Sequence, residues 1–115
     1  MYETIDIEKI AQLVERIGTT LFAHIANSRD QDVATKWLND VRTNAPTFEQ
    51  IRNIEFTIEC LDKAKSAGVS DYTAYNWLIG RNAASGGVSP AEAIHSGDLR
   101  AAEMSLNKLI NSTQS

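Results

Sequence analysis

His95, Ser96 and Asp98 have the side chains that serve as base, nucleophile and orienting carboxylate in serine hydrolases. In such enzymes the histidine contacts the hydroxyl with one ring nitrogen and the carboxylate with the other. Three neighbours at the end of a short helix do not converge in this way, and no oxyanion motif accompanies them. We therefore interpret His95 as a helix C-terminal residue favoured by the helix dipole, and His24 as an ordinary helix residue. We expect no catalytic residue.

Metal, redox and phosphate chemistry have equally little support. Cys60 is the only cysteine, which excludes an intramolecular disulfide and a multi-cysteine zinc site, and two histidines are too few for a metal cluster. The segment Ser85–Pro90, SGGVSP, lacks the spacing and the lysine of a P-loop. We expect neither a metal nor a cofactor.

Composition indicates one soluble globular domain. The chain has 115 residues, of which 43% are hydrophobic and 23% charged. A net charge of −4 argues against a strongly basic nucleic-acid-binding surface. No apolar run is long enough to cross a bilayer, and the segment MYETIDIEKIAQ lacks the regions of a secretory signal. We expect a cytoplasmic protein that does not bind a membrane.

Apolar residues recur at helical spacing along nearly the whole chain, so we predict an all-α fold of about seven helices. The first two helices are expected over residues 7–17 and 20–26, the third after Ser28, and the longest over 48–66. Three more are expected to follow Ser70, Ser89 and Asp98. Ser28 with Gln31, Thr47 with Gln50, and Ser89 with Glu92 have the spacing of capping boxes. We expect a compact unit with a region 1–66 and a region 67–115, and a mobile tail over residues 111–115.

The longest predicted helix has an unusually broad apolar surface. Its stripe consists of Phe48, Ile51, Ile54, Ile58 and Leu61, and Phe56 and Cys60 widen it. Together with the first helix, this breadth predicts burial on two sides and favours a homodimer. The carboxylates of this helix, beside its own basic residues, predict an exposed face with ion pairs inside the helix. Trp37 and Trp77 are expected in the core, whereas Tyr72 and Tyr75 could line a partner groove or pack at an edge.

The segment LFAHIANSRDQDVATKWLNDVR, residues 21–42, resembles a helix-turn-helix, with Ala23 as the small residue of the first helix and Val33 as the buried residue of the second. It departs from the usual pattern at Asn27, Ser28 and Trp37. The residues expected to contact operator DNA are Arg29, Gln31, Thr35, Lys36, Asn39 and Arg42. Three aspartates in the same segment oppose phosphate contact, so a helix-turn-helix that serves only as scaffold is the alternative.

The segment WLIGRNAASGGVSPAEAIHSGDLRAAEMSLNKLI, residues 77–110, resembles the toxin-binding domain of the Xre/MbcA/ParS antitoxin family. The matching residues are Trp77, Leu78, Asn82, Gly86, Gly87, Ser89, Pro90, Ile94, Gly97 and Asp98. Ala83 stands where the family has proline, and Ser85 where it has an apolar residue.

This resemblance implies a protein that binds operator DNA through its N-terminal half and a RES-domain toxin, which consumes NAD, through its C-terminal half. The final helix and tail would cover the toxin's NAD pocket, so inhibition would be steric. The contacts implied by position are Arg100, Lys108, Asn111, Ser112, Thr113, Gln114 and Ser115. Some actinobacteriophage immunity repressors resemble the same two-part arrangement, so a repressor without a toxin is the alternative.

Overall fold

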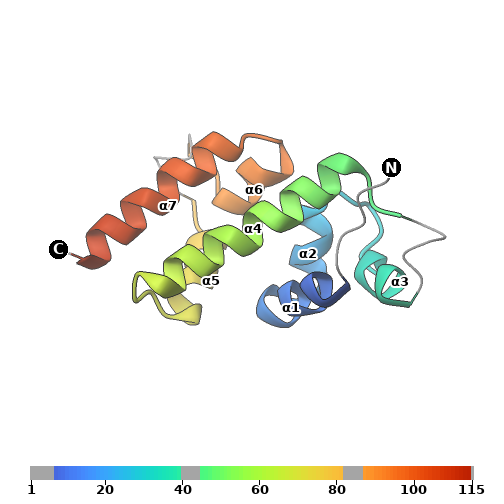
Figure 1. Cartoon of the computed structure of the whole chain (residues 1–115). Coiled ribbons are helices and arrows are strands. Elements are labelled where there is room, and N and C mark those ends of the chain that lie inside the picture. The colour runs from blue at the N-terminus through green and yellow to red at the C-terminus, as the bar shows by residue number, and fades with distance from the viewer. Residues whose placement is uncertain (1–6, 40–44, 82–86, 115) are drawn as a thin grey trace.

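The computed structural model describes residues 7–39, 45–81 and 87–114, and within these ranges the protein is all-α. The predicted fold class is therefore confirmed, with seven helices among the described residues. Their bounds are α1 Ile7–Ile17, α2 Thr19–Ile25, α3 Val33–Asn39, α4 Phe48–Ser66, α5 Asp71–Ile79, α6 Pro90–His95 and α7 Leu99–Gln114 (Figure 1).

Most helices begin where a polar side chain can bind their first free N–H groups. Thr47 and Gln50 form both halves of a capping box, with the Gln50 N–H donating to Thr47 Oγ1 at 3.2 Å and the Thr47 N–H donating to Gln50 Oε1 at 2.8 Å. Ser70, Ser89 and Asp98 accept from backbone N–H groups of α5, α6 and α7. These predicted helix starts are confirmed.

The predicted start of the third helix at Ser28 is wrong. Residues 26–32 form a connection, and α3 begins only at Val33. Ser28 Oγ accepts from the Asp30 N–H at 3.1 Å, and Asp30 Oδ1 accepts from the Asp32 N–H at 2.9 Å. Short polar side chains that bind their own backbone in this way compete with helix formation. The end of the predicted third helix, including Arg42, lies outside the described residues.

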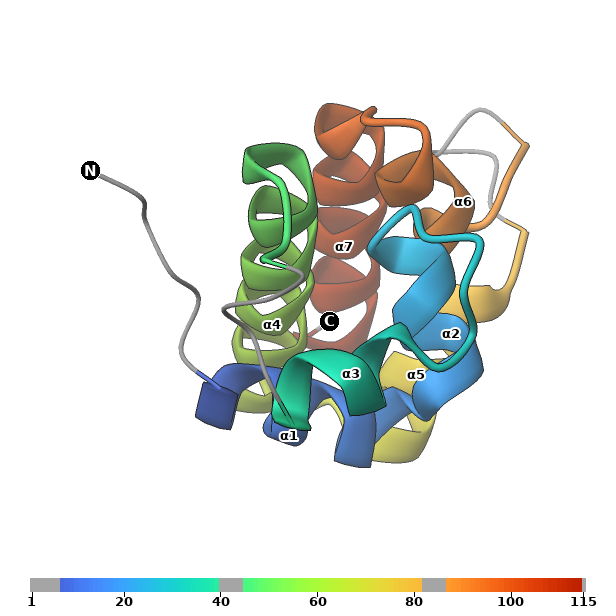
Figure 2. The ribbon, with the colours of Figure 1, turned by 90° about the vertical axis from the view of Figure 1, so that its right-hand side faces the viewer.

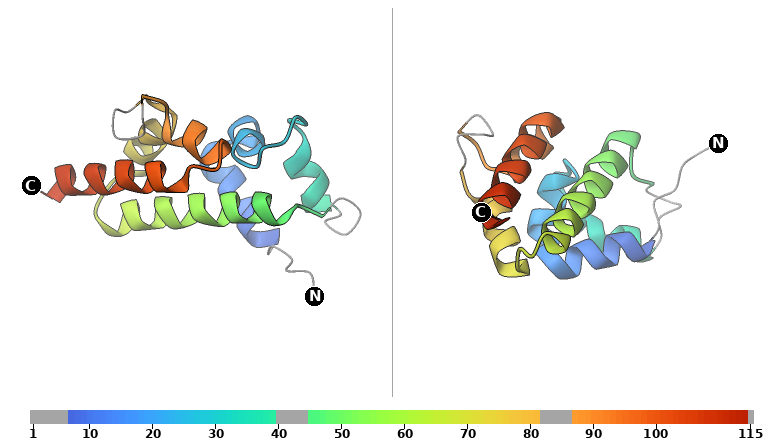
Figure 3. Two further views of the ribbon diagram at one scale, coloured as in Figure 1. Left: turned by 90° about the horizontal axis from the view of Figure 1, so that it is seen from above. Right: turned by 60° about the vertical axis from the view of Figure 1, so that its left-hand side comes forward.

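The two longest helices, α4 and α7, lie side by side and run in the same direction along the molecule (Figures 1 and 3). The short helix α6 packs between α7 and the helices α2 and α5, while α1 crosses α4 and contacts α3 (Figure 2). The molecule measures 47 × 27 × 25 Å. Its long dimension follows the α4–α7 pair.

The core lies under the predicted stripe of α4, with one exception. Ile51, Ile54, Ile58 and Leu61 are buried, but Phe48 is 73% exposed, so its predicted place in the stripe of this core is wrong. Phe48 is the first residue of α4 and follows its apolar period. The other helices do not extend far enough along α4 to cover it.

Both tryptophans lie in the core, as predicted. Trp37 packs edge-on against Phe22, with ring centroids 6.0 Å apart, and joins α3 to α2. Trp77 is buried between α5 and α7. Tyr72, by contrast, is 78% exposed.

Ion pairs join α1 to α4. Lys9 Nζ lies 3.1 Å from Glu55 Oε2, and Arg16 Nη1 lies 2.8 Å from Asp62 Oδ1. The prediction of pairs within the long helix is therefore wrong for these two carboxylates. Exposed pairs of this kind stabilise a fold by about 0.2–1 kcal/mol each. Both pairs hold α1 against α4.

No helix in the described part of the chain combines the length and the apolar character that a membrane span requires.

Candidate functional site

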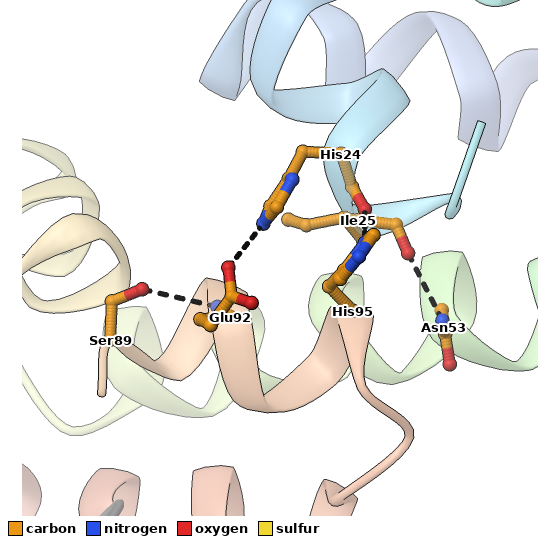
Figure 4. Close-up of polar contacts among 6 residues, drawn as sticks. All are labelled: His24, Ile25, Asn53, Ser89, Glu92 and His95. Carbon is orange, nitrogen blue, oxygen red and sulfur yellow. Dashed lines mark hydrogen bonds and ion pairs between the residues drawn. The ribbon is translucent and has the colours of Figure 1, made fainter. Parts of the chain in front are cut away.

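A polar cluster joins α2 to α6 (Figure 4). The imidazole rings of His24 and His95 stack with centroids 4.2 Å apart and planes 6° from parallel. His24 Nε2 lies 2.9 Å from Glu92 Oε2. His95 Nδ1 lies 2.8 Å from the carbonyl oxygen of His24, which can only accept, so this nitrogen carries the proton.

These contacts correct two predictions. Glu92 does not complete a capping box with Ser89, because its carboxylate contacts His24. His24 is more than an ordinary helix residue, since its ring and its carbonyl both contact α6. The local part of the prediction is confirmed: the Glu92 N–H donates to Ser89 Oγ at 3.1 Å.

The same end of α2 is held by a buried amide of α4. Asn53 Nδ2 donates to the carbonyl oxygen of Ile25 at 3.0 Å, and Asn53 is only 3% exposed. Arg52 Nη2 donates to Asn53 Oδ1 at 3.3 Å. A polar hollow borders this amide, with Asn27 and His95 in its lining. The cluster thus supplies the last carbonyls of α2 with donors from α4 and α6.

The geometry around His95 differs from that of a serine nucleophile. Its Nδ1 is engaged by the His24 carbonyl, and Asp98 Oδ1 accepts from the Ala101 N–H at 3.2 Å at the start of α7. Asp98 therefore serves as a helix cap, and no hydrogen bond joins it to His95 within the described residues. The chemical function visible in the cluster is hydrogen bonding that fixes three helices.

Cys60 is 2% exposed, and burial raises the pKa of its thiol to about 12. A thiol of this kind is a poor nucleophile near neutral pH. The described residues hold no group of three His, Cys, Asp or Glu side chains arranged for a metal ion.

The predicted DNA-contacting residues form an exposed set. Arg29 and Gln31 lie in the connection before α3, and Thr35, Lys36 and Asn39 lie on α3 itself. All five are exposed, whereas Arg42 lies outside the described residues. Ala23 and Val33 are buried, as the helix-turn-helix pattern predicts. The connection over residues 26–32 is nevertheless longer than the turn of about three or four residues that is usual in this motif.

Lys36 is not free to act as an unpaired cation. Its Nζ is paired with the Asp30 carboxylate. This hydrogen bond lowers the pKa of Asp30, with a further contribution from the Asp32 N–H, and it raises the pKa of Lys36. The pair reduces the positive charge that the predicted DNA-binding surface offers to phosphates.

The predicted toxin-contacting residues lie on α7. Arg100, Lys108, Asn111 and Ser112 are exposed. The helix continues to Gln114, so the part of the predicted tail over residues 111–114 is helical. The side chains of Thr113 and Gln114, and all of Ser115, lie outside the described residues.

A residue that sequence analysis did not single out belongs to this surface. Met104 is 55% exposed and shares one face of α7 with Arg100, Asn107 and Asn111, because these positions follow the helical period. Its signal in the sequence is that it is an apolar residue outside the inner stripe of α7, where Ala102 and Leu106 are buried and Leu109 is partly buried.

Two features fix the direction of α7. Gly97, which separates α6 from α7, has φ +85°, a conformation that favours glycine. Further along, Trp77 Nε1 donates to Ser105 Oγ at 2.8 Å in the protein interior. The corner and the hydrogen bond together hold the exposed face of α7 at a set angle to the body.

Comparison with protein-family models, with curated proteins and with solved structures gives no match for this chain.

Proposed function

We propose that this protein is an antitoxin of the Xre/MbcA/ParS type, which neutralises a RES-type NAD-consuming toxin by covering its active site with α7. The observation that carries the proposal is the exposed face of α7, formed by Arg100, Met104, Asn107 and Asn111 on a helix whose opposite face is firmly packed. The resemblance of residues 77–110 supports the choice of partner.

The composition of this face suits a protein interface. Met104 offers a flexible apolar contact at its centre. Arg100, Asn107 and Asn111 surround it with groups that can donate hydrogen bonds, as in the polar rim of many interfaces. A face of this kind inhibits by occupying space, so no side chain of the antitoxin needs to react.

Rigidity also favours this role. The contacts of His24, Asn53 and His95 fix α2 against α4 and α6, and the buried Trp77–Ser105 bond fixes α7. An inhibitor that is ordered before binding loses less conformational entropy when it docks.

The test is co-expression with the protein encoded by the adjacent open reading frame, followed by copurification and an assay of NAD consumption. We expect the partner to copurify inactive with the full chain. A chain that lacks residues 111–115 loses the last turn of α7 and should leave the partner active. A copurified partner that consumes NAD at the same rate with and without the antitoxin would contradict the proposal.

Operator binding is the second candidate function, and a specific observation favours it. Arg29, Gln31 and Asn39 are exposed together near α3, and arginine and amide side chains can read base edges. If this surface binds DNA, Asp30→Asn should strengthen binding, because it releases Lys36 from its ion pair. Binding should weaken with added salt. A helix-turn-helix that is only scaffold would bind operator DNA in neither form.

A further inference from the structure

One stripe of α4 has an aromatic side chain at its N-terminal end and another at its middle, and it ends beside a shallow hollow. Phe48, Arg52, Phe56, Glu59 and Lys63 follow one another at helical spacing on α4. All are exposed except Phe56, which is partly buried against the core. We call these five residues the α4 stripe. Its ends, Phe48 and Lys63, lie about 22 Å apart at 1.5 Å per residue.

The two ends of the α4 stripe differ in shape. Phe48 projects from the N-terminal end with 73% of its surface exposed. Near the C-terminal end, α4 and α7 border a shallow hollow. It is lined by Ala67 and Ile110 and by the polar residues Glu59, Asp62, Lys63 and Ser66. Ala67 and Ile110 therefore offer apolar carbon atoms in the hollow, where no aromatic side chain of the described residues belongs to the lining.

We propose that a second copy of this chain packs on the α4 stripe about a two-fold axis, with the two α4 helices antiparallel. Phe48 of each protomer then enters the hollow beside Ile110 of the other. The axis passes near Phe56, because this residue lies halfway between Phe48 and the residues of the hollow. An isologous contact is self-complementary, and here the α4 stripe supplies the projection at one end while the hollow that begins beside Lys63 lies at its other end.

The charges on the stripe fit the same arrangement. Arg52 and Glu59 lie four residues before and three residues after Phe56. Antiparallel packing about Phe56 places Arg52 of one protomer opposite Glu59 of the other, and the symmetry repeats the pair. In the isolated chain neither side chain has an ion-pair partner among the described residues, where Arg52 donates only to Asn53.

Two further carboxylates border this patch, but both are already paired. Glu55 lines the space beside Phe48 and Phe56, and Asp62 lines the hollow. Lys9 and Arg16 of α1 form ion pairs with them. The proposed dimer also leaves the Arg100–Met104–Asn111 face of α7 uncovered. Dimerisation is therefore independent of toxin binding, and either proposal can fail without the other.

The first test is sedimentation equilibrium of the full chain over a wide concentration series. We expect the wild type to dimerise, and Phe48→Asp to raise the dimer dissociation constant by about thirtyfold or more, as for a central aromatic at an interface. Tyr72→Ser is the matched control, since Tyr72 is equally exposed but lies on α5, and it should leave the dimer unchanged. Circular dichroism verifies that each variant is folded.

The second test exchanges the charges. Arg52→Glu and Glu59→Arg each place like charges opposite one another at two symmetric positions in the dimer. Each single variant should therefore raise the dimer dissociation constant by up to about tenfold. The double variant Arg52→Glu/Glu59→Arg should restore association. A wild type that is monomeric throughout, a dimer that Phe48→Asp does not weaken, or a double variant as weak as the single ones would overturn the proposal.

Discussion

Trp77 Nε1 donates a hydrogen bond of 2.8 Å to Ser105 Oγ, and this bond joins α5 to α7 inside the protein. Trp77 is 7% exposed and Ser105 is fully buried, so water cannot replace either partner. The bond fixes the helix on which the proposed toxin-binding face lies.

We predict that Ser105→Ala lowers the free energy of unfolding by about 1–3 kcal/mol, because it leaves the indole N–H without an acceptor. Urea unfolding measures the change. Ser66→Ala, on the exposed end of α4, is the control and should change stability by less than about 0.5 kcal/mol. A double-mutant cycle with Trp77→Phe separates the hydrogen bond from the loss of volume, and a coupling free energy near zero would contradict the assignment.

The hydrogen bond from the Asn53 amide should contribute to the stability of the protein as the Trp77–Ser105 bond does, because it binds the C-terminal end of α2. Asn53→Asp removes the donor to the Ile25 carbonyl and buries a carboxyl group, so we expect it to cost about 2 kcal/mol or more. Asn76→Ala is the matched control, because Asn76 also donates to a backbone carbonyl, that of Tyr72, but is exposed. Thermal unfolding of the two variants should differ by several degrees. Equal melting temperatures would show that the Ile25 bond contributes little.

The two stacked histidines, His24 and His95, should contribute differently to the free energy of unfolding. His95→Phe keeps a ring against His24 but leaves the His24 carbonyl without its donor, at a cost of about 1 kcal/mol. His24→Phe removes only the contact with Glu92, which is then free to complete the capping box with Ser89, so it should cost less. Chemical denaturation compares the two, and a larger loss for His24→Phe would contradict this division.

The raised pKa of Cys60 gives a prediction for alkaline pH. The native state holds the thiol proton up to a pKa of about 12, whereas the unfolded chain releases it near 9. The contribution of this group to stability is therefore fully present below pH 9 and is lost as the pH rises toward 12. Cys60→Ala should show a shallower fall in stability over that window than the wild type.

Thiol labelling provides the independent measurement. At pH 8 the native protein should react with a disulfide reagent far more slowly than the protein in urea. Labelling at equal rates would show that Cys60 is accessible.

The helix starts could be predicted from the sequence, because they depend on residues that are close together in the chain. Thr47, Ser70, Ser89 and Asp98 cap helices because the groups that they bind are three residues away. Ser28 has the same local signal and failed, because Asp30 binds the Asp32 N–H and a turn forms where the helix was expected. Two local hydrogen-bonding patterns competed, and spacing alone did not decide between them.

The remaining features depend on residues that are distant in the sequence. Glu92 contacts His24 across 68 positions, which no capping rule anticipates. Phe48 follows the apolar period of α4 but is exposed. The period shows which face of a helix is apolar, but it does not show how far along that face other helices pack. The candidate toxin-binding residues share only a position on the final helix, whereas the exposure of Met104 depends on which face of α7 packs against the other helices.

The most direct measurement of the proposed function is a titration of the copurified partner's NAD consumption with this protein. We expect the wild type to abolish activity at a stoichiometric ratio. A variant carrying Met104→Asp and Asn107→Arg should inhibit with a dissociation constant raised at least about thirtyfold, since it alters the centre of the exposed face of α7. Thr35→Ala, on the exposed face of α3, should inhibit like the wild type. Equal inhibition by the α7 variant and the wild type would contradict the claim that α7 covers the active site.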